Sequence, residues 1–364
     1  MSAAKASPAL FDGRYKPCAP ARKGGTGTVI VCDDQNLERK VAIKFLQRID
    51  DKRRMNDEIA ALQRIRSKNV VQVFDVIIVQ PGNQIGLVQE FLPGDDLRKL
   101  PAKPMEPSSY LRLLYQIASG LDDIHEQGII HRDIKPNNMK TDQEGLVKIF
   151  DFDLSRDDGA DAKTVGFRGT PGYAAPELYT FGSVVFTTAV DVYAYAATAL
   201  YCAQGKLDPS LEQNPPNPEA WKKAHGFAAL KIAVPGEIVG FLDASLSTDP
   251  GKRPAIHDIR IALERHLLQG RHRAVLVYDG NTTVCDAANS SVRLAKKGVG
   301  ELTVTYDTLR FTVEGVQGDV FVNNDRLDSG DELPGSCVIT LGGPELGTKR
   351  DFVTLDVSHP EVVL

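Results

Sequence analysis

Short runs of β-branched residues broken by turns fill the chain from about Gly13 to Val88, and one helical pattern interrupts them. In that interruption apolar residues recur every three or four positions, at Met55, Ile59, Leu62 and Ile65. Such spacing places the four side chains on one face of a helix, whereas the β-branched runs favour strands. The pattern predicts a small sheet with one helix packed against it.

A longer helical stripe follows Ser108. Its apolar positions are Leu111, Leu114, Ile117, Leu121 and Ile124. Ser108 or Ser109 stands where a helix N-cap is expected, because a short hydroxyl side chain accepts a hydrogen bond from an N–H group of the first turn. We expect helices to dominate from here to about residue 270.

Beyond about residue 270 the hydrophobic period changes to two. Leu302, Val304 and Tyr306 alternate with threonines. Further short apolar runs, separated by Gly and Asn-Asp turns, contain Val320, Val322, Val338 and Val353. Alternation of this kind over short segments is typical of a β-sandwich or barrel. The pattern predicts a domain boundary near residue 270 and an all-β domain after it.

Composition fits a soluble globular protein, since the 364 residues are 42% hydrophobic and 25% charged. The five cysteines form no Cys-x-x-Cys pair and the histidines no ligand spacing, so neither a disulfide framework nor a zinc site is predicted. Residues 274–364 hold 7 Lys and Arg against 14 Asp and Glu, and no basic tract suited to nucleic acid occurs in the chain. The first ten residues lack an apolar core of signal-peptide length, and no internal stretch is long and apolar enough for a membrane span. We expect a cytoplasmic protein.

The eight residues from His131 to Asn138, His-Arg-Asp-Ile-Lys-Pro-Asn-Asn, set an acid, a cation and an amide at fixed offsets. They resemble the catalytic loop of protein kinases, which reads His-Arg-Asp, four variable residues and Asn. The resemblance implies phosphoryl transfer from ATP, in which Asp133 orients the substrate hydroxyl and accepts its proton, and Lys135 neutralises charge on the transferring group. Asn138 and Asp151 would supply oxygens for Mg²⁺, with Mn²⁺ as a substitute.

The segment from Arg22 to Val29 looks like the glycine-rich loop of the same family. Glycines let backbone N–H groups approach phosphates closely. Val41-Ala42-Ile43-Lys44 follows at the distance of one strand, turn and strand. By resemblance, Lys44 would contact the α- and β-phosphates and Glu58 on the following helix would pair with it, with Asp57 as the competing acid.

The segment from Leu87 to Gly94 resembles the hinge between the two lobes of a kinase. The C=O of Glu90 and the N–H of Leu92 would then hold adenine, Gln89 would be the gatekeeper, and Asp96 would reach the ribose. The implied ATP-binding residues are Arg22, Gly24, Gly25, Gly27, Val29, Ala42, Lys44, Gln89, Glu90, Leu92 and Asp96.

Residues around the catalytic loop indicate a subclass. A lysine two residues after the catalytic Asp, here Lys135, is typical of serine/threonine kinases, and residues 169–177 resemble their substrate-binding segment. By resemblance, Glu177 would form a buried ion pair with Arg253, and Asp191 would anchor the catalytic loop from below. All three residues would have structural roles.

Two threonines are candidate regulatory positions. Thr164 lies between Asp151 and Pro176, where activating phosphorylation is expected, and Arg132 is placed to pair with the added phosphate. The alternative is an ordinary loop threonine. Thr170 is the second candidate position.

Two positions depart from the family pattern. The motif that would read Asp-Phe-Gly is Asp151-Phe152-Asp153, and Arg22 replaces the first glycine of the glycine-rich loop. A side chain at Asp153 restricts backbone torsions that glycine leaves open and adds a carboxylate beside the metal site. The substitution predicts altered regulation or metal affinity, and the alternative is a pseudokinase scaffold or binding module with little activity.

The C-terminal part is similar to the end of a forkhead-associated (FHA) domain, a β-sandwich that binds phosphothreonine. The resemblance rests on residues 320–327, Gly330 and residues 337–342. The Gly-Arg and Ser-x-x-His elements that grip the phosphate are not evident between Tyr278 and Arg310, and Gly318 replaces an expected asparagine. The resemblance therefore indicates an FHA-like fold, in which docking of a partner or of the kinase domain is as plausible as phosphopeptide binding.

Together these patterns predict an α+β protein of two domains. Residues 12–269 would form a two-lobed serine/threonine kinase of bacterial type, with a β-rich N-lobe at about 12–91 and a larger helical C-lobe at about 92–269. Residues 274–364 would form an all-β sandwich that docks partners or regulates the kinase. The expected reaction is transfer from ATP to Ser or Thr of protein substrates, with autophosphorylation.

Overall fold

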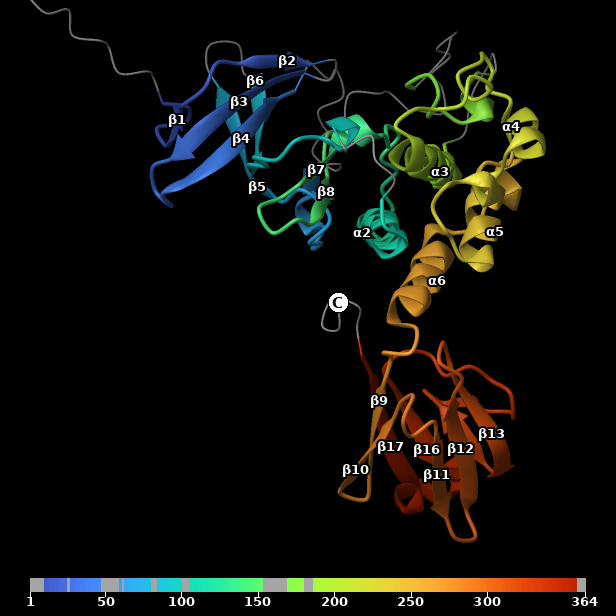
Figure 1. The fold of residues 1–364 in the computed structure, drawn as a ribbon. Helices are drawn as coiled ribbons and strands as arrows, with labels where there is room; N and C mark the ends of the chain where they lie inside the picture. The colour runs from blue at the N-terminus through green and yellow to red at the C-terminus, as the bar shows by residue number, and fades with distance from the viewer. Residues whose placement is uncertain are drawn as a thin grey trace, which may run out of the picture. The chain divides into compact units, whose positions relative to one another are not determined.

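The chain forms two compact units, Met1–Arg260 and Ile261–Leu364, and the boundary between them lies inside helix α6 (Ile256–Leu268). The computed structural model describes residues 10–24, 27–46, 59–60, 62–79, 84–99, 105–152, 169–179 and 186–358 (Figure 1). The predicted boundary near residue 270 lies close to the end of this helix. Each unit has its own core.

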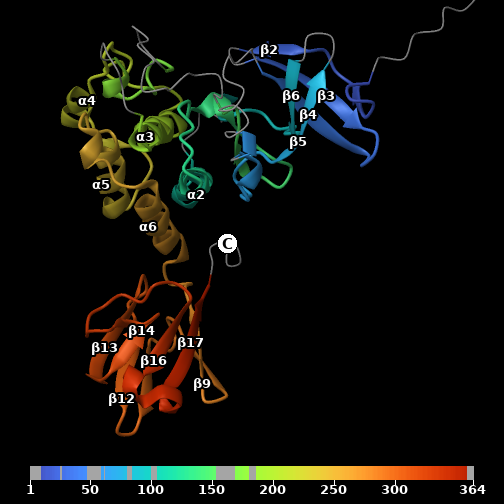
Figure 2. The same cartoon turned by 180° about the vertical axis from the view of Figure 1, so that it is seen from behind.

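The first unit begins with a six-stranded antiparallel sheet, in agreement with the β-branched runs of the sequence (Figure 2). The strands are β1 (Tyr15–Pro17), β2 (Arg22–Gly24), β3 (Gly27–Asp34), β4 (Arg39–Phe45), β5 (Val73–Val79) and β6 (Gln84–Glu90). They follow the order β1-β3-β4-β6-β5, and β2 pairs with β3. One face of the sheet buries a cluster that includes Tyr15, Ile43 and Val88, which removes apolar surface from water.

The helical pattern inserted among the strands is confirmed for its described part. Residues 59–60 and 62–64 are helical, and Ile59, Leu62 and Ile65 are all buried. Ile59 packs with Leu87 of β6, which places this helical segment against the sheet. Met55 lies outside the described residues.

The rest of the first unit is mainly helical. Its helices are α2 (Pro107–Glu126), α3 (Ala189–Gln204), α4 (Pro218–Ala224) and α5 (Gly236–Ser245), and it also contains the beginning of α6. Short 3-10 helices lie at Leu97–Lys99, Pro136–Asn138, Pro176–Tyr179, Phe227–Ala229 and Pro250–Lys252. A two-stranded hairpin, β7 (Met139–Thr141) with β8 (Val147–Ile149), follows the segment that contains the predicted catalytic residues.

Helix α2 confirms the predicted apolar stripe and corrects the predicted cap. All five stripe positions are buried: Leu111, Leu114, Ile117, Leu121 and Ile124. Neither Ser108 nor Ser109 is the N-cap, because Glu106 occupies that position without a side-chain cap bond and Pro107 begins the helix. Proline suits the first helical position, since its φ is already helical and its missing N–H would be unpaired there.

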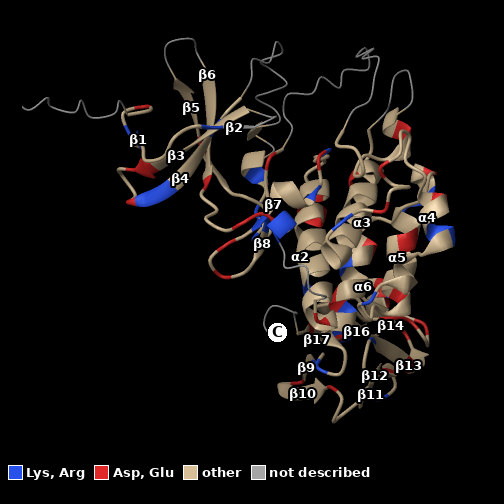
Figure 3. Ribbon diagram, turned by 45° about the horizontal axis from the view of Figure 1, so that its top comes forward, with Lys and Arg blue, Asp and Glu red and all other residues tan. Residues whose placement is uncertain are grey.

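Helix α3 is buried on almost every side. Figure 3 shows its ribbon almost free of charged positions, and Asp191 is the acidic residue of its first turn. Two tyrosine hydroxyls tie it to α2: Tyr110 donates to the C=O of Ala199 at 2.9 Å, and Tyr195 donates to the C=O of Leu114 at 3.2 Å. A helix held in this way can place a buried carboxylate accurately.

The second unit consists of strands in two sheets. The strands are β9 (Ala274–Tyr278), β10 (Asn281–Cys285), β11 (Ser291–Lys296), β12 (Gly300–Tyr306), β13 (Phe311–Gly318), β14 (Val320–Val322), β15 (Asp325–Arg326), β16 (Cys337–Leu341) and β17 (Asp351–Val357), with a 3-10 segment at Pro344–Lys349. One sheet has the order β10-β9-β17-β16-β14-β15 and the other β11-β12-β13. Both contribute to one buried cluster, so the unit is a β domain.

The predicted alternation in this unit is confirmed along β12, where Leu302, Val304 and Tyr306 are buried and the residues between them are partly exposed. Val320 and Val353 are also buried, whereas Val338 is 38% exposed. All five cysteine thiols are free. Among the described helices, none combines the length and the apolar character that a bilayer crossing requires.

Candidate active site

Asp191 holds the segment that begins at His131. Its carboxylate is fully buried and accepts the backbone N–H of His131 and that of Arg132, each at 2.8 Å. It also lies 3.0 Å from Nε2 of His125, at the end of α2. A carboxylate from α3 therefore satisfies two N–H groups of a loop far away in the sequence, and hydrogen bonds to a charged acceptor are among the strongest in proteins.

Asp133 is the centre of a polar cluster. One carboxylate oxygen lies 2.7 Å from Nζ of Lys135 and accepts Nδ2 of Asn138 at 2.8 Å. The other oxygen accepts the hydroxyl of Thr170 at 2.8 Å, and the same hydroxyl accepts from Lys135 at 2.8 Å. Burial by itself raises the pKa of Asp133, but the hydrogen bond and charge of Lys135, together with the hydrogen bonds from Thr170 and Asn138, outweigh it, so the pKa is lowered. The group is ionised at neutral pH.

The contact with Thr170 was not predicted from the sequence, which marked this residue only as a candidate regulatory position. It lies 37 positions from Asp133 in the chain, and no local periodicity connects the two. The other candidate regulatory residues, Asp153 and Thr164, lie outside the described residues.

Lys44 and Asp151 meet in the structure. Nζ of Lys44 lies 2.5 Å from Oδ1 of Asp151 and donates to the C=O of Phe152 at 3.0 Å. The lysine side chain is buried, since β4 carries it into the interior of the unit. Glu58, the predicted partner of Lys44, lies outside the described residues.

The donor set fits a hard divalent cation. Asp151 offers carboxylate oxygens, and Asn138 donates through Nδ2 to both the backbone C=O and the side chain of Asp133, which leaves its amide oxygen as the acceptor for another group. Mg²⁺ prefers oxygen ligands of this kind together with phosphate oxygens. The chemistry of the residues present is therefore compatible with the predicted metal.

Two residues of this site have left-handed backbone conformations. Arg132 and Asp151 both have φ of 69°. Such values are uncommon for residues with a Cβ atom and cost free energy that the surrounding contacts must offset. Strain of this kind concentrates at functional sites, which supports a functional role for this segment.

A cavity of about 260 Å³ opens between β-strands of the N-terminal sheet and the β7 region. Nine of the predicted nucleotide-site or metal residues line it: Arg22, Gly27, Val29, Ala42, Lys44, Gln89, Glu90, Leu92 and Asp151. Five further lining residues were missed: Val31, Val71, Phe91, Lys140 and Phe150. Side chains along a strand point alternately to its two faces. Because Met139 of β7 is buried in the core, its neighbour Lys140 points to the opposite face, and the sequence alone does not show which of the two residues is buried.

Three predicted nucleotide-site residues do not line this cavity. Asp96 forms an ion pair with Arg98 at 2.7 Å. Gly24 ends β2, and Gly25 lies outside the described residues. Both carboxylate oxygens of Asp96 therefore already accept hydrogen bonds from Arg98.

Glu177 and Arg253, which the resemblance paired, are joined by two parallel hydrogen bonds of 2.7 and 2.8 Å. Arg253 also donates to the C=O of Ser247 at 2.9 Å and to that of Ala189 at 3.0 Å. This bidentate geometry links the segment after Thr170 to α3 and to the turn before α6.

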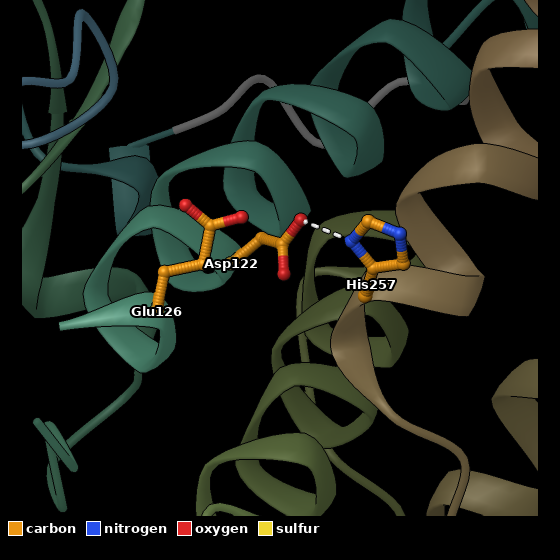
Figure 4. A group of neighbouring side chains, drawn as sticks. All are labelled: Asp122, Glu126 and His257. Atoms are coloured by element: carbon orange, nitrogen blue, oxygen red, sulfur yellow. Dashed lines mark hydrogen bonds and ion pairs between the residues drawn. The ribbon is translucent and has the colours of Figure 1, made fainter. Parts of the chain in front are cut away.

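A separate cluster of Asp122, Glu126 and His257 joins α2 to α6 (Figure 4). Asp122 lies 3.0 Å from Nδ1 of His257 and 2.8 Å from Nε of Arg260. The guanidinium already supplies the positive charge that a cation would bring, so we interpret the cluster as an ion-pair contact between helices.

His131 is buried as a neutral imidazole. Its Nε2 lies 3.1 Å from the C=O of Phe150, which only accepts, and its Nδ1 lies 3.4 Å from the N–H of Asp133, which only donates. Burial lowers the pKa of His131 below its ordinary value, although the charges of Asp191 and Asp133 oppose the shift. A second proton would break the contact at Nδ1.

We therefore expect the free energy of unfolding to fall as the pH drops below about 6.5, because the unfolded chain then takes up a proton that folded His131 resists. Urea unfolding between about pH 8 and about pH 5.5 measures this slope. His131→Gln should have the shallower slope. Equal slopes for wild type and His131→Gln would contradict the expectation.

The chain belongs to the protein kinase family: the family described as "Protein kinase domain" matches residues 22–262. Serine/threonine-protein kinase pkn2 of Myxococcus xanthus is 32% identical over 277 residues, which cover 70% of this chain and 32% of that protein. Serine/threonine-protein kinase 12 of Arabidopsis thaliana is 29% identical over 248 residues, 65% of this chain and 52% of the relative. The Drosophila melanogaster ovarian-specific serine/threonine-protein kinase Lok is 31% identical over 256 residues, which cover 65% of this chain and 53% of that protein. The chain spans about a third to a half of the length of these relatives.

Proposed function

We propose that this chain is an ATP-dependent, non-specific serine/threonine protein kinase, which transfers the γ-phosphoryl group to Ser or Thr hydroxyls of protein substrates and autophosphorylates. The observation that carries the proposal is the cluster at Asp133, where an ionised carboxylate contacts both Lys135 and Thr170. The family match and the serine/threonine kinases among its relatives support it.

In this proposal the substrate hydroxyl lies against Asp133, whose lowered pKa keeps it able to accept the proton. Lys135 then stabilises the charge of the transferring group. Lys44 binds the α- and β-phosphates, which requires it to exchange part of its contact with Asp151. Mg²⁺, when bound through Asn138 and Asp151, would neutralise phosphate charge. Most of the rate then comes from positioning and charge.

We place the kinase domain at residues 12–269 and a second domain at residues 274–364. An FHA-like β-sandwich is our proposal for the second domain, supported by two sheets that share one buried cluster. It would dock a protein partner or regulate the kinase. The absence of a basic tract in the sequence favours a protein ligand over nucleic acid, and a reducing cytoplasm is the setting we propose.

A pseudokinase scaffold is the second candidate function, because Asp153 replaces the glycine that follows Phe152 in the family pattern. The chain has the residues that catalysis requires, Asp133, Lys44 and Lys135 and the candidate metal ligands Asn138 and Asp151. A scaffold without activity would not need them. Phosphoryl transfer therefore separates the two candidates.

The test is transfer of label from radiolabelled ATP, with Mg²⁺, to a generic threonine-rich protein substrate. We expect Lys44→Met to lower the rate about 10- to 100-fold, since one charge-assisted hydrogen bond contributes about 1.5–3 kcal/mol. Lys40→Met is the matched control, because Lys40 lies on the same strand with its side chain 55% exposed. If folded wild-type protein transferred no more label than Lys44→Met, the result would contradict the proposal of an enzyme and favour a pseudokinase scaffold.

A further inference from the structure

A second cavity, of about 410 Å³, lies beside the segment that follows Thr170. Its lining is mainly aromatic and apolar and includes two charged side chains; the residues that matter here are Tyr173, Tyr201, Leu207, Pro209, Lys206 and Glu212. The centres of the two tyrosine rings are 6.5 Å apart, and the rings are tilted by 54°. We call this the Tyr173–Tyr201 cavity.

The Tyr173–Tyr201 cavity adjoins the place where the proposed function puts the substrate hydroxyl. Thr170, whose hydroxyl contacts Asp133 at 2.8 Å, is three positions before Tyr173 in the chain. Tyr173 also lines a small cavity together with Asp133 and Thr170. Three residues of extended chain span about 10 Å. A substrate side chain about two to four positions from the phosphorylated residue therefore reaches the Tyr173–Tyr201 cavity.

Two further observations place Glu212 against this cavity. A Cβ atom added to Gly172, whose φ of 85° favours glycine, would lie 3.5 Å from Cγ of Glu212. Burial raises the pKa of Tyr173, and among the nearby charges that of Glu212 adds to the shift. The carboxylate of Glu212 is therefore within electrostatic reach of the Tyr173 hydroxyl.

The cations around the cavity already face other carboxylates. Arg98 lies near the two tyrosines and donates to both carboxylate oxygens of Asp96, at 2.9 and 2.7 Å. Burial raises the pKa of Asp208, but its hydrogen bonds and the nearby cations, Lys206 among them, lower it overall. Glu212 forms no ion pair with any residue in the part of the chain that the structure describes. Its negative charge is the one left to a ligand.

We propose that Glu212 makes this kinase prefer protein substrates with an arginine about two to four positions from the phosphorylated Ser or Thr. The inference rests on the proposed function. The guanidinium stacks on a tyrosine ring of the cavity and donates two parallel hydrogen bonds to the carboxylate of Glu212. Arginine suits the cavity better than lysine, because its planar group makes both contacts at once.

The experiment compares peptides phosphorylated by the full chain. Each peptide has one threonine and, at one of the four positions on either side of it, either arginine or citrulline, the neutral isostere of arginine. The readout is the ratio of kcat/KM for the two peptides at each position. At the preferred position we expect arginine to exceed citrulline about 10- to 100-fold, the effect of a charge-assisted hydrogen bond.

Three substitutions assign this preference to the cavity. Glu212→Gln should bring the ratio down to about one to three, since the amide keeps the shape and removes the charge. Tyr201→Leu should lower the ratio about two- to fivefold, whereas Tyr201→Phe, which keeps the ring, should preserve it. The citrulline peptide is the reference within each protein, so a smaller folded fraction does not change the ratio.

Glu219→Gln is the matched control, because this glutamate is 61% exposed, lies outside the cavity lining and contacts Lys222. It should keep the wild-type ratio. A wild-type ratio near one at every position would overturn the inference, as would a wild-type ratio that persists in Glu212→Gln. A peptide with phenylalanine at the preferred position that exceeds the arginine peptide would also overturn it. Absence of label in all peptides and in the generic protein substrate would contradict the proposed function as well.

Discussion

Asp133→Asn is expected to lower the rate of phosphoryl transfer about 10²- to 10⁴-fold, the range that a positioned general base contributes. The substitution removes the negative charge that Lys135 contacts at 2.7 Å and replaces one oxygen by an NH₂ group. In one orientation that NH₂ group would face Lys135 and Asn138, which have no acceptor to offer there, and in the other it would replace the oxygen that accepts the hydroxyl of Thr170. The rate is measured with saturating ATP and a protein substrate.

The expected loss is confined to catalysis. Nucleotide binding should change little, because Asp133 does not line the cavity that holds the predicted nucleotide-site residues. Asp95→Asn makes the same chemical change at a side chain 70% exposed and should keep the wild-type rate. If Asp133→Asn retained more than about a tenth of the wild-type rate, about 1.4 kcal/mol in the barrier, Asp133 would not be the base.

Asp191→Ala is expected to lower the free energy of unfolding by about 2–6 kcal/mol, since it leaves the N–H groups of His131 and Arg132 without an acceptor in the interior and each such group costs about 1–3 kcal/mol. The catalytic rate should fall as well, because these two residues precede Asp133. Urea unfolding measures the first effect and phosphoryl transfer by the folded fraction measures the second.

Asp142→Ala is the matched control for this effect. Asp142 also accepts two backbone N–H groups, those of Glu144 and Leu146, each at 2.9 Å, but it does so in a partly exposed turn where water can replace it. We expect a loss of about 1 kcal/mol or less. Similar losses for the two variants would show that burial of Asp191 is not what makes it important.

Much of the fold was predictable from local periodicity. The stripe along α2 and the alternation along β12 are both confirmed, because a helix repeats every 3.6 residues and a strand every two. The N-cap of α2 was predicted wrongly. A serine near the start of an apolar stripe does not reveal that the helix already begins at Pro107, before Ser108 and Ser109. Helix starts depend on backbone torsions that a side-chain pattern does not report.

The candidate site was predictable in its parts and in two of its connections, the pairing of Glu177 with Arg253 and the anchoring of the loop by Asp191, which the family resemblance implied. The sequence by itself determined which residues are the candidates for the chemistry: an acid, a lysine and an amide within residues 131–138, a lysine at 44 and a carboxylate at 151. Only the tertiary structure decided that Thr170 contacts Asp133, which two N–H groups of the loop Asp191 accepts, and that Lys140 lines the same cavity as the predicted nucleotide-site residues. These contacts join residues far apart in the chain, and their partners are chosen by how helices and strands pack, which the spacing of residues along one segment does not specify.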